Sequence, residues 1–442
     1  MRKFLLASTA VVGAAVLVPT VAEAQQAPTV RIGGYFRAYY GYTQQNNTVG
    51  INTPMYGPGP TDTSEPNLAN RSARLGHNDF STDAEVHVFV NGKAANGLSY
   101  GAVIEIQFDA MEGAVRNNAR RAVNNKTTAS LDEMYAFVAS PTLGQLRFGD
   151  EDGPFGGLMN VGWVTNFGTG GVFGDWESFM VRPNRTGTTP GGVGDNTKII
   201  YLSPQFFGFD FGVSYAPNEG EGEDTGCLNS YANVNCDRAY AVTNAAGNGR
   251  SHDQPGRLNE IQAAIRWRGN IAGVGLAAGF STLQSQVIRE AAAATGDITR
   301  TLRNPSVYQV GAQATYMGFT IGGGYMWGNT SFYYIPTARG AKDMSQFFGG
   351  ASYTMGPISV GANFFTGQYE GGGGDLLGVG MRRWGYGIGA NYRLAPGMDL
   401  VAEYVRHEVK EPGSAALLGT ANYAGTDRAK GSVFLTGVRL AF

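Results

Sequence analysis

The stretch Thr29–Tyr42, with the sequence TVRIGGYFRAYYGY, alternates between two kinds of side chain and decides the fold. Its even-numbered positions, from Val30 to Tyr42, are apolar, aromatic or glycine, whereas its odd-numbered positions include Arg31 and Arg37. Because successive side chains of a β-strand point to opposite faces, this period of two predicts a strand with one apolar and one polar face.

The same alternation recurs along most of the chain, in the stretches 80–91, 98–109, 261–268, 308–316, 319–327, 358–364, 386–394 and 433–442. Two architectures produce such a pattern. A soluble β-sandwich hides its apolar faces between two sheets. A transmembrane barrel turns them toward lipid and keeps the polar faces around water.

Three features favour the transmembrane barrel. The longer alternating stretches approach or exceed the roughly 9–11 residues that cross a bilayer at a tilt, whereas soluble strands average about 5–6. Aromatic residues such as Tyr40, Tyr316 and Trp327 lie near the ends of the apolar faces, where interfacial girdles form. The opposite faces carry Gly, Ser, Gln and Arg, which are too small and polar for a dry core. We therefore predict an all-β fold, a transmembrane antiparallel β-barrel.

Composition excludes other classes of protein. Lys and Arg number 33 against 35 Asp and Glu, so the chain lacks the basic excess of a nucleic-acid binder. After the N-terminus no run of about 18 apolar residues exists, which excludes a helical membrane protein. The chain has four His residues and no Gly-x-Ser-x-Gly element, so we expect no enzyme activity and no cofactor.

The N-terminus has the features of a cleaved signal peptide. Basic Met1–Lys3 precedes the apolar stretch Phe4–Val18, and a small-x-small site ends at Ala24. We expect cleavage between Ala24 and Gln25, which makes residues 1–24 the signal peptide and 25–442 a single barrel domain. In an oxidising compartment, the nine-residue spacing of Cys227 and Cys236 predicts a disulfide within one loop.

Connections between the predicted strands alternate between short turns and long loops. The eight long loops cover residues 43–71, 110–128, 151–195, 217–258, 283–304, 329–343, 371–380 and 411–430. Eight long loops interleaved with short turns imply sixteen strands, with the short turns on the periplasmic side and the long loops outside.

Four segments resemble the general, non-specific porins of Gram-negative bacteria. They are the opening strand Val30–Tyr42, the strand Leu143–Gly149, the segment Asn196–Tyr215 and the final strand Val433–Phe442. The resemblance implies a homotrimer of sixteen-stranded, water-filled channels in the outer membrane, through which small hydrophilic solutes and ions diffuse passively. It also implies contact with outer-membrane lipid and lipopolysaccharide, and it makes Phe442 part of a signal read by the barrel-assembly machinery.

In such porins the third loop, here about 151–195, folds into the pore and faces a ladder of arginines. The resemblance therefore implies that acids in or beside this loop are candidates for the constriction of the pore. They are Asp150, Glu151, Asp152, Asp175, Glu177 and Asp195, and the same loop also contains Arg182 and Arg185. Arg74 is the best match to the arginine ladder of the family. Strand parity, that is, the alternation of positions between the two faces of a strand, also places six arginines on the water-facing side: Arg31, Arg37, Arg147, Arg383, Arg393 and Arg439. We hypothesise that loop acids and wall arginines create a transverse field across the narrowest part. Pro154–Gly157 resembles the family's Pro-Glu-Phe-Gly element but lacks its Glu, which leaves open which acid faces the constriction.

Two alternatives remain open at this point. A solute-specific channel, for instance for sugars, would line its path with aromatics, and Phe155, Phe167, Phe173 and Trp176 lie in the inward loop. The acidic stretch Glu219–Asp224 is a weaker candidate for binding a divalent cation at the outer surface, and a solvated loop is the simpler interpretation.

Overall fold

A computed structural model gives the fold and describes residues 26–45, 77–108, 129–180, 188–220, 257–287, 302–331, 334, 336–370, 380–410 and 428–442. Several predictions lie outside these residues: the signal peptide 1–24 with its cleavage site at Ala24 and Gln25, Arg74, Arg182, Arg185, and the pair Cys227 and Cys236. Within the described residues, no helix is both long enough and apolar enough to span a membrane.

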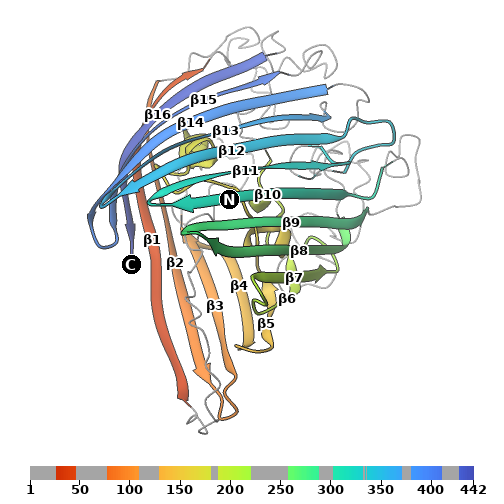
Figure 1. Ribbon diagram of the computed structural model, residues 1–442. Coiled ribbons are helices and arrows are strands. Elements are labelled where there is room, and N and C mark those ends of the chain that lie inside the picture. Colours follow the sequence, from red (N-terminus) through yellow and green to blue (C-terminus); the bar gives the residue numbers. More distant parts are fainter. Residues whose placement is uncertain are drawn as a thin grey trace, which may run out of the picture.

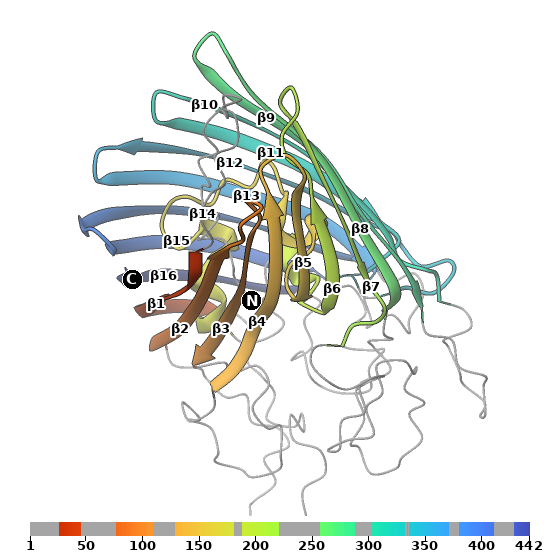
Figure 2. The ribbon, with the colours of Figure 1, turned by 90° about the horizontal axis from the view of Figure 1, so that it is seen from below.

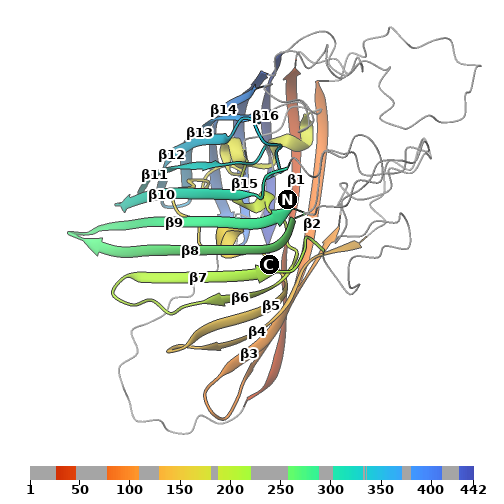
Figure 3. The ribbon, with the colours of Figure 1, turned by 90° about the vertical axis from the view of Figure 1, so that its right-hand side faces the viewer.

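The described residues form one closed antiparallel barrel of sixteen strands, in which every strand pairs with its neighbours in sequence (Figures 1 and 3). The last strand closes the barrel against the first, and Phe442 exchanges backbone hydrogen bonds with Gly34 at 3.0 and 3.1 Å. The predicted fold and strand count are confirmed. The strands are β1 (Gln26–Gln45), β2 (Asn78–Lys93), β3 (Ser99–Phe108), β4 (Ala129–Ser140), β5 (Gly144–Asp150), β6 (Thr197–Leu202), β7 (Phe209–Ala216), β8 (Arg257–Ile271), β9 (Val274–Val287), β10 (Ser306–Tyr316), β11 (Phe319–Gly328), β12 (Met344–Met355), β13 (Ile358–Glu370), β14 (Gly380–Ala395), β15 (Met398–Lys410) and β16 (Arg428–Ala441).

The short turns lie together at one end of the barrel, as the sequence predicts. Residues 317–318 alone join β10 to β11, and both Met317 and Gly318 have positive φ, 45° and 84°. Two central residues with positive φ make the type I′ turn, whose twist matches that of a β-hairpin. The connection from β5 to β6 is described except for residues 181–187, and its helical turns lie within the barrel (Figure 2).

The two faces of the strands divide as the alternation predicts. On β8 the side chain of Ile265 is 48% exposed on the outside, whereas Gln262 on the inner face is fully buried. On β13 Phe364 is exposed on the outside, and its neighbour Asn363 is buried inside. The outer surface is therefore an apolar belt, and this partition positions polar side chains around the lumen.

Candidate functional site

The third loop, of which residues 151–180 and 188–196 are described, lines part of the barrel interior. These described residues contain four short helical turns, η2 (Pro154–Leu158), η3 (Gly171–Phe173), η4 (Asp175–Phe179) and η5 (Pro190–Gly192). The turn η2 contacts β7, β8 and β9, η3 contacts β13, β14 and β15, and η4 contacts β16, β1 and β2. The loop therefore follows the inner wall around the barrel from β7 to β2.

Glycines of the wall make room for this loop. A Cβ atom on Gly311 would lie 2.0 Å from the carbonyl oxygen of Val161, and one on Gly387 would lie 2.3 Å from the amide nitrogen of Val172. Such distances exclude any side chain, so only glycine permits this approach of loop backbone to strand. The expectation that the small inner face stays wet is wrong for this arc, because its glycines are covered by the loop.

Glu403 on β15 binds the middle of the loop. Its carboxylate accepts hydrogen bonds from the backbone N–H of Thr169 at 2.9 Å, from the Thr169 hydroxyl at 2.8 Å and from the N–H of Gly171 at 2.8 Å. The Glu403 side chain is buried. A buried carboxylate with three donors is a strong anchor, because each hydrogen bond to a charged group contributes about 1.5–3 kcal/mol.

Asn363 on β13 anchors the same part of the loop. Its amide nitrogen donates to the carbonyl oxygens of Val164 and Gly170 at 2.9 and 2.8 Å, and its amide oxygen accepts from the N–H of Val172 at 2.8 Å. One side-chain amide thereby satisfies three backbone groups of the loop, which fixes its path along β13.

Gln262 on β8 performs the equivalent role at the start of the loop. Its side-chain oxygen accepts from the N–H groups of Phe155 and Gly156 at 3.1 and 3.0 Å. Its nitrogen donates to Glu260 at 2.8 Å, which orients the amide. The first turn of the loop is therefore held by a polar side chain that alternation places on the inner face.

The aromatic residues of the loop pack against the wall. Phe155, Phe167, Phe173 and Trp176 are all buried. Trp163 adds to this packing by stacking on Phe348 of β12, with ring centroids 3.7 Å apart and planes 15° apart. The aromatics singled out for a sugar path therefore hold the loop in place, and they do not line an open route for solutes.

Arg37 and Asp175 lie in direct contact. Both carboxylate oxygens of Asp175 are 3.1 Å from Nη1 of Arg37, and the guanidinium also lies 3.6 Å from Asp83 and over the ring of Tyr35. Arg37 and Asp175 are buried. Strand parity placed Arg37 correctly on the inner face. For this pair, however, the expected separation of opposite charges across the constriction is wrong, since the ion pair ties η4 to β1.

Arg147 is also paired with an acid of the loop. It lies 2.5 Å from Glu151, four residues further along the chain, and its guanidinium faces the ring of Tyr135 on β4. The ammonium of Lys198 on β6 donates to the backbone oxygen of Glu151. Arg383, on the inner face of β14, is buried. These residues lie inward as the parity predicts.

The other predicted acids lie near the loop or its ends. Asp150, the last residue of β5, accepts a hydrogen bond from the hydroxyl of Thr197 across the β5–β6 pair. Asp152 is buried, whereas Glu177 and Asp195 are half-buried.

The remaining wall arginines lie toward the end of the barrel that carries the short turns. Arg439 and Arg393 both approach Asp399, at 3.0 and 3.6 Å. Arg31 is exposed, and its guanidinium lies 4.1 Å from the centre of the Phe89 ring. Arg31 and Arg393 therefore lie away from the part of the loop that η4 anchors to β1, whereas Arg439 is the direct partner of Arg37 across the β1–β16 pair.

The external acidic stretch is described only at its start. Glu219 lies 3.0 Å from the guanidinium of Arg257, which also pairs with Glu260 at 2.8 Å. Residues 221–224 lie outside the described part of the chain. Glu219 therefore belongs to an ion pair at the mouth of the barrel.

Strands β2 and β3 present a group of inward residues that did not enter the predicted site. Glu85, His87 and Glu105 lie on their inner faces, and the hydroxyl of Tyr35 donates to Glu85 at 2.8 Å. The alternation of positions along β2 is enough to place Glu85 and His87 on the face toward the lumen. The pairing register of β2 with β3, which the sequence does not give, brings Glu105 beside them. Gln262, Asn363 and Glu403 were missed because nothing in their own sequence context indicates which loop backbone they meet.

Comparisons with known proteins agree with this architecture. A family model described as Gram-negative porin matches residues 7–412. No curated protein sequence matches the chain at a significant level.

Three solved structures share the fold at 11% sequence identity and cover 94% of this chain. They are the outer membrane channel DcaP of Acinetobacter baumannii (TM-score 0.52, 97% of that chain), a loop L8 deletion mutant of OmpT of Vibrio cholerae (TM-score 0.51, 100% of that chain) and in-vitro folded OmpT of Vibrio cholerae in a trimer form (TM-score 0.50, 100% of that chain). At this identity the likeness concerns the fold. The match of the family model across nearly the whole chain carries the assignment, and the chain belongs to the Gram-negative porin family.

Proposed function

We propose that each barrel is a general pore of the outer membrane, through which small hydrophilic solutes and ions diffuse passively without a dedicated binding site. A closed barrel with an apolar outer belt fits a bilayer, and polar side chains around the lumen keep a path of water through it. The observation that carries the proposal is the third loop, which Gln262, Asn363 and Glu403 hold against the inner wall. A loop fixed at three points narrows the lumen permanently and sets a size limit for solutes.

A solute-specific channel is the weaker candidate. Specific recognition needs aromatic and polar groups that a passing solute touches. The loop aromatics Phe155, Phe167, Phe173 and Trp176 are buried against the wall, so they offer no stacking surface to a sugar.

Liposome swelling with a graded series of neutral sugars separates the two functions. A general pore gives rates that fall smoothly with solute size and rise in proportion to concentration. Saturation of the rate with one sugar, and competition by that sugar against others of equal size, would contradict the general pore.

The functional unit of this proposal is a homotrimer embedded in lipid and lipopolysaccharide. OmpT of Vibrio cholerae, which shares the fold, was solved in a trimer form. Phe442 ends the barrel at its closure with β1, where the assembly machinery would read it as part of the final strand. Crosslinking of the purified protein in detergent tests the trimer, and a species no larger than a monomer would count against it.

Charged groups of the loop and wall would set ion selectivity. The ion pairs Arg37–Asp175 and Arg147–Glu151 neutralise part of the predicted transverse field. What remains of that field depends on the acids and arginines that line the lumen outside these two pairs. Reversal potentials across a salt gradient measure this balance, because a net negative constriction favours cations and a net positive one favours anions.

A further inference from the structure

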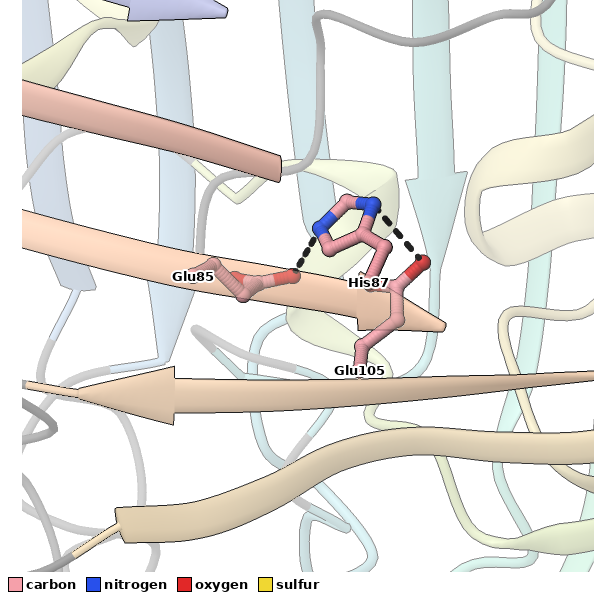
Figure 4. Close-up of side chains that lie close together, drawn as sticks. All are labelled: Glu85, His87 and Glu105. Carbon is pink, nitrogen blue, oxygen red and sulfur yellow. Dashed lines mark hydrogen bonds and ion pairs between the residues drawn. The ribbon is translucent and has the colours of Figure 1, made fainter. Parts of the chain in front are cut away.

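Three potential metal ligands share one face of the β2–β3 pair. Glu85 and His87 are two positions apart on β2, so their side chains point to the same side, and Glu105 is the direct partner of His87 on β3. Nε2 of His87 lies 2.7 Å from Oε1 of Glu85, and Nδ1 lies 3.7 Å from Oε1 of Glu105. Figure 4 shows the imidazole between the two carboxylates.

We propose that Glu85, His87 and Glu105 form a binding site for a divalent transition-metal ion of the Zn²⁺ class. One donor atom from each residue lies within 4.8 Å of the other two. Ligand bonds of about 2.0–2.2 Å place donor atoms up to about 4 Å apart around one ion, so small rotations of the side chains bring all three onto a common metal. Neutral imidazole and carboxylate are both established ligands for Zn²⁺.

The surroundings of the three residues favour a bound cation. Glu85 and His87 are only 3% and 5% exposed, so the carboxylate is largely removed from water. Two acids beside one imidazole carry a net negative charge that a divalent ion neutralises, and burying unneutralised charge is costly. The hydroxyl of Tyr35 donates to the second oxygen of Glu85 at 2.8 Å, which leaves Oε1 directed toward the imidazole. Such a donor behind a ligand orients it and tunes metal affinity.

The imidazole determines the class of metal. Mg²⁺ and Ca²⁺ take oxygen ligands, whereas imidazole nitrogen suits Zn²⁺, Cu²⁺ and Ni²⁺. A second group of acids, Glu133, Asp152 and Asp195, contains no imidazole, and the charges of Asp152 and Asp195 already act on the ammonium of Lys198. That second group carries no such proposal and provides a control.

A metal at this position would act on transport, a consequence that rests on the proposed pore. The described helical turns η2 to η5 of the third loop contact the wall mainly on other strands, and η4 contacts β2. A divalent ion bound on β2 and β3 would make this part of the lumen less negative. Bound Zn²⁺ should therefore lower the preference of the channel for cations.

Direct binding tests the site independently of transport. The full mature protein, refolded without lipopolysaccharide and washed with EDTA, is titrated with zinc chloride by calorimetry in detergent under non-reducing conditions. We expect one ion per protomer and a loss of affinity of about tenfold or more in His87→Gln and in Glu105→Gln. The matched controls His77→Gln and Glu133→Gln should bind zinc like the wild type, and MgCl₂ should not compete.

The result that overturns the proposal is absence of zinc binding by the wild type, or unchanged affinity in both His87→Gln and Glu105→Gln. Circular dichroism and the heat-dependent mobility of the barrel on gels show which variants fold. If His87→Gln fails to fold, Glu105→Gln decides the question. Conductance then separates the two proposals, because a protein that binds zinc but forms no channel refutes the pore and leaves the metal site standing.

Discussion

Replacing Glu403 by Ala should release the middle of the third loop without opening the barrel. The substitution removes three hydrogen bonds, to the N–H and hydroxyl of Thr169 and to the N–H of Gly171. Each such bond to a charged acceptor contributes about 1.5–3 kcal/mol, and relief from burying the carboxylate offsets part of the sum. We expect a net loss of about 3 kcal/mol in the free energy of opening this segment, or about 100-fold in its opening equilibrium.

Hydrogen exchange of peptides covering residues 166–176, followed by mass spectrometry, measures this change in the opening equilibrium. Protected amides exchange only when the segment opens locally. Glu403→Gln keeps an acceptor for the backbone donors and can donate to the hydroxyl oxygen of Thr169, so its exchange should rise much less. Asp399→Asn, on the same strand but paired with Arg439, should leave the loop unchanged. Equal exchange in Glu403→Ala and the wild type would refute the assignment of Glu403 as a loop anchor.

Three further outcomes follow from the geometry. Arg37→Gln removes the positive charge beside Asp175 and should shift the reversal potential toward cations. Asp175→Asn should shift it toward anions, and the double variant should lie near the wild type. Shifts of the same sign in the two single variants would contradict the ion pair. Gly387→Val forces the loop off β14 and should raise single-channel conductance or noise, whereas Gly191→Ala, where a Cβ meets open space, should not. Ile265→Arg, on the outer face near the middle of β8, should lower stability in lipid vesicles by about 2–4 kcal/mol in urea unfolding, and no loss would contradict its contact with lipid.

The barrel is predictable from sequence because the alternation of apolar and polar residues within each strand indicates which face meets lipid and which meets the lumen. Alternation along Thr29–Tyr42 depends only on neighbouring positions, and the same rule identified Arg37, Arg147 and His87 as inward. Turn residues such as Gly318 likewise indicate the position of a hairpin from the local sequence alone.

The arrangement of the third loop cannot be predicted from local sequence, because it depends on contacts between residues that are far apart in the chain. Glu403 and Thr169 are 234 positions apart, and Asn363 and Val172 are 191 apart, so no spacing rule pairs them. The small inner faces were interpreted as lying around water, because the contacts that glycines such as Gly311 and Gly387 make with the loop depend on its path. The sequence led to the hypothesis that loop acids and wall arginines are separated across the constriction, whereas Arg37 and Asp175 lie in contact. The same long-range dependence on the path of the loop explains this difference.

The central claim is that the polar faces of sixteen strands enclose a continuous path of water, narrowed by an anchored loop. Recording of the purified, reconstituted protein in planar lipid bilayers tests it most directly. The account predicts stepwise insertions whose ohmic conductance rises nearly in proportion to salt concentration, with increased open-channel noise in Glu403→Ala. Bilayers that stay electrically silent with correctly folded protein would contradict it.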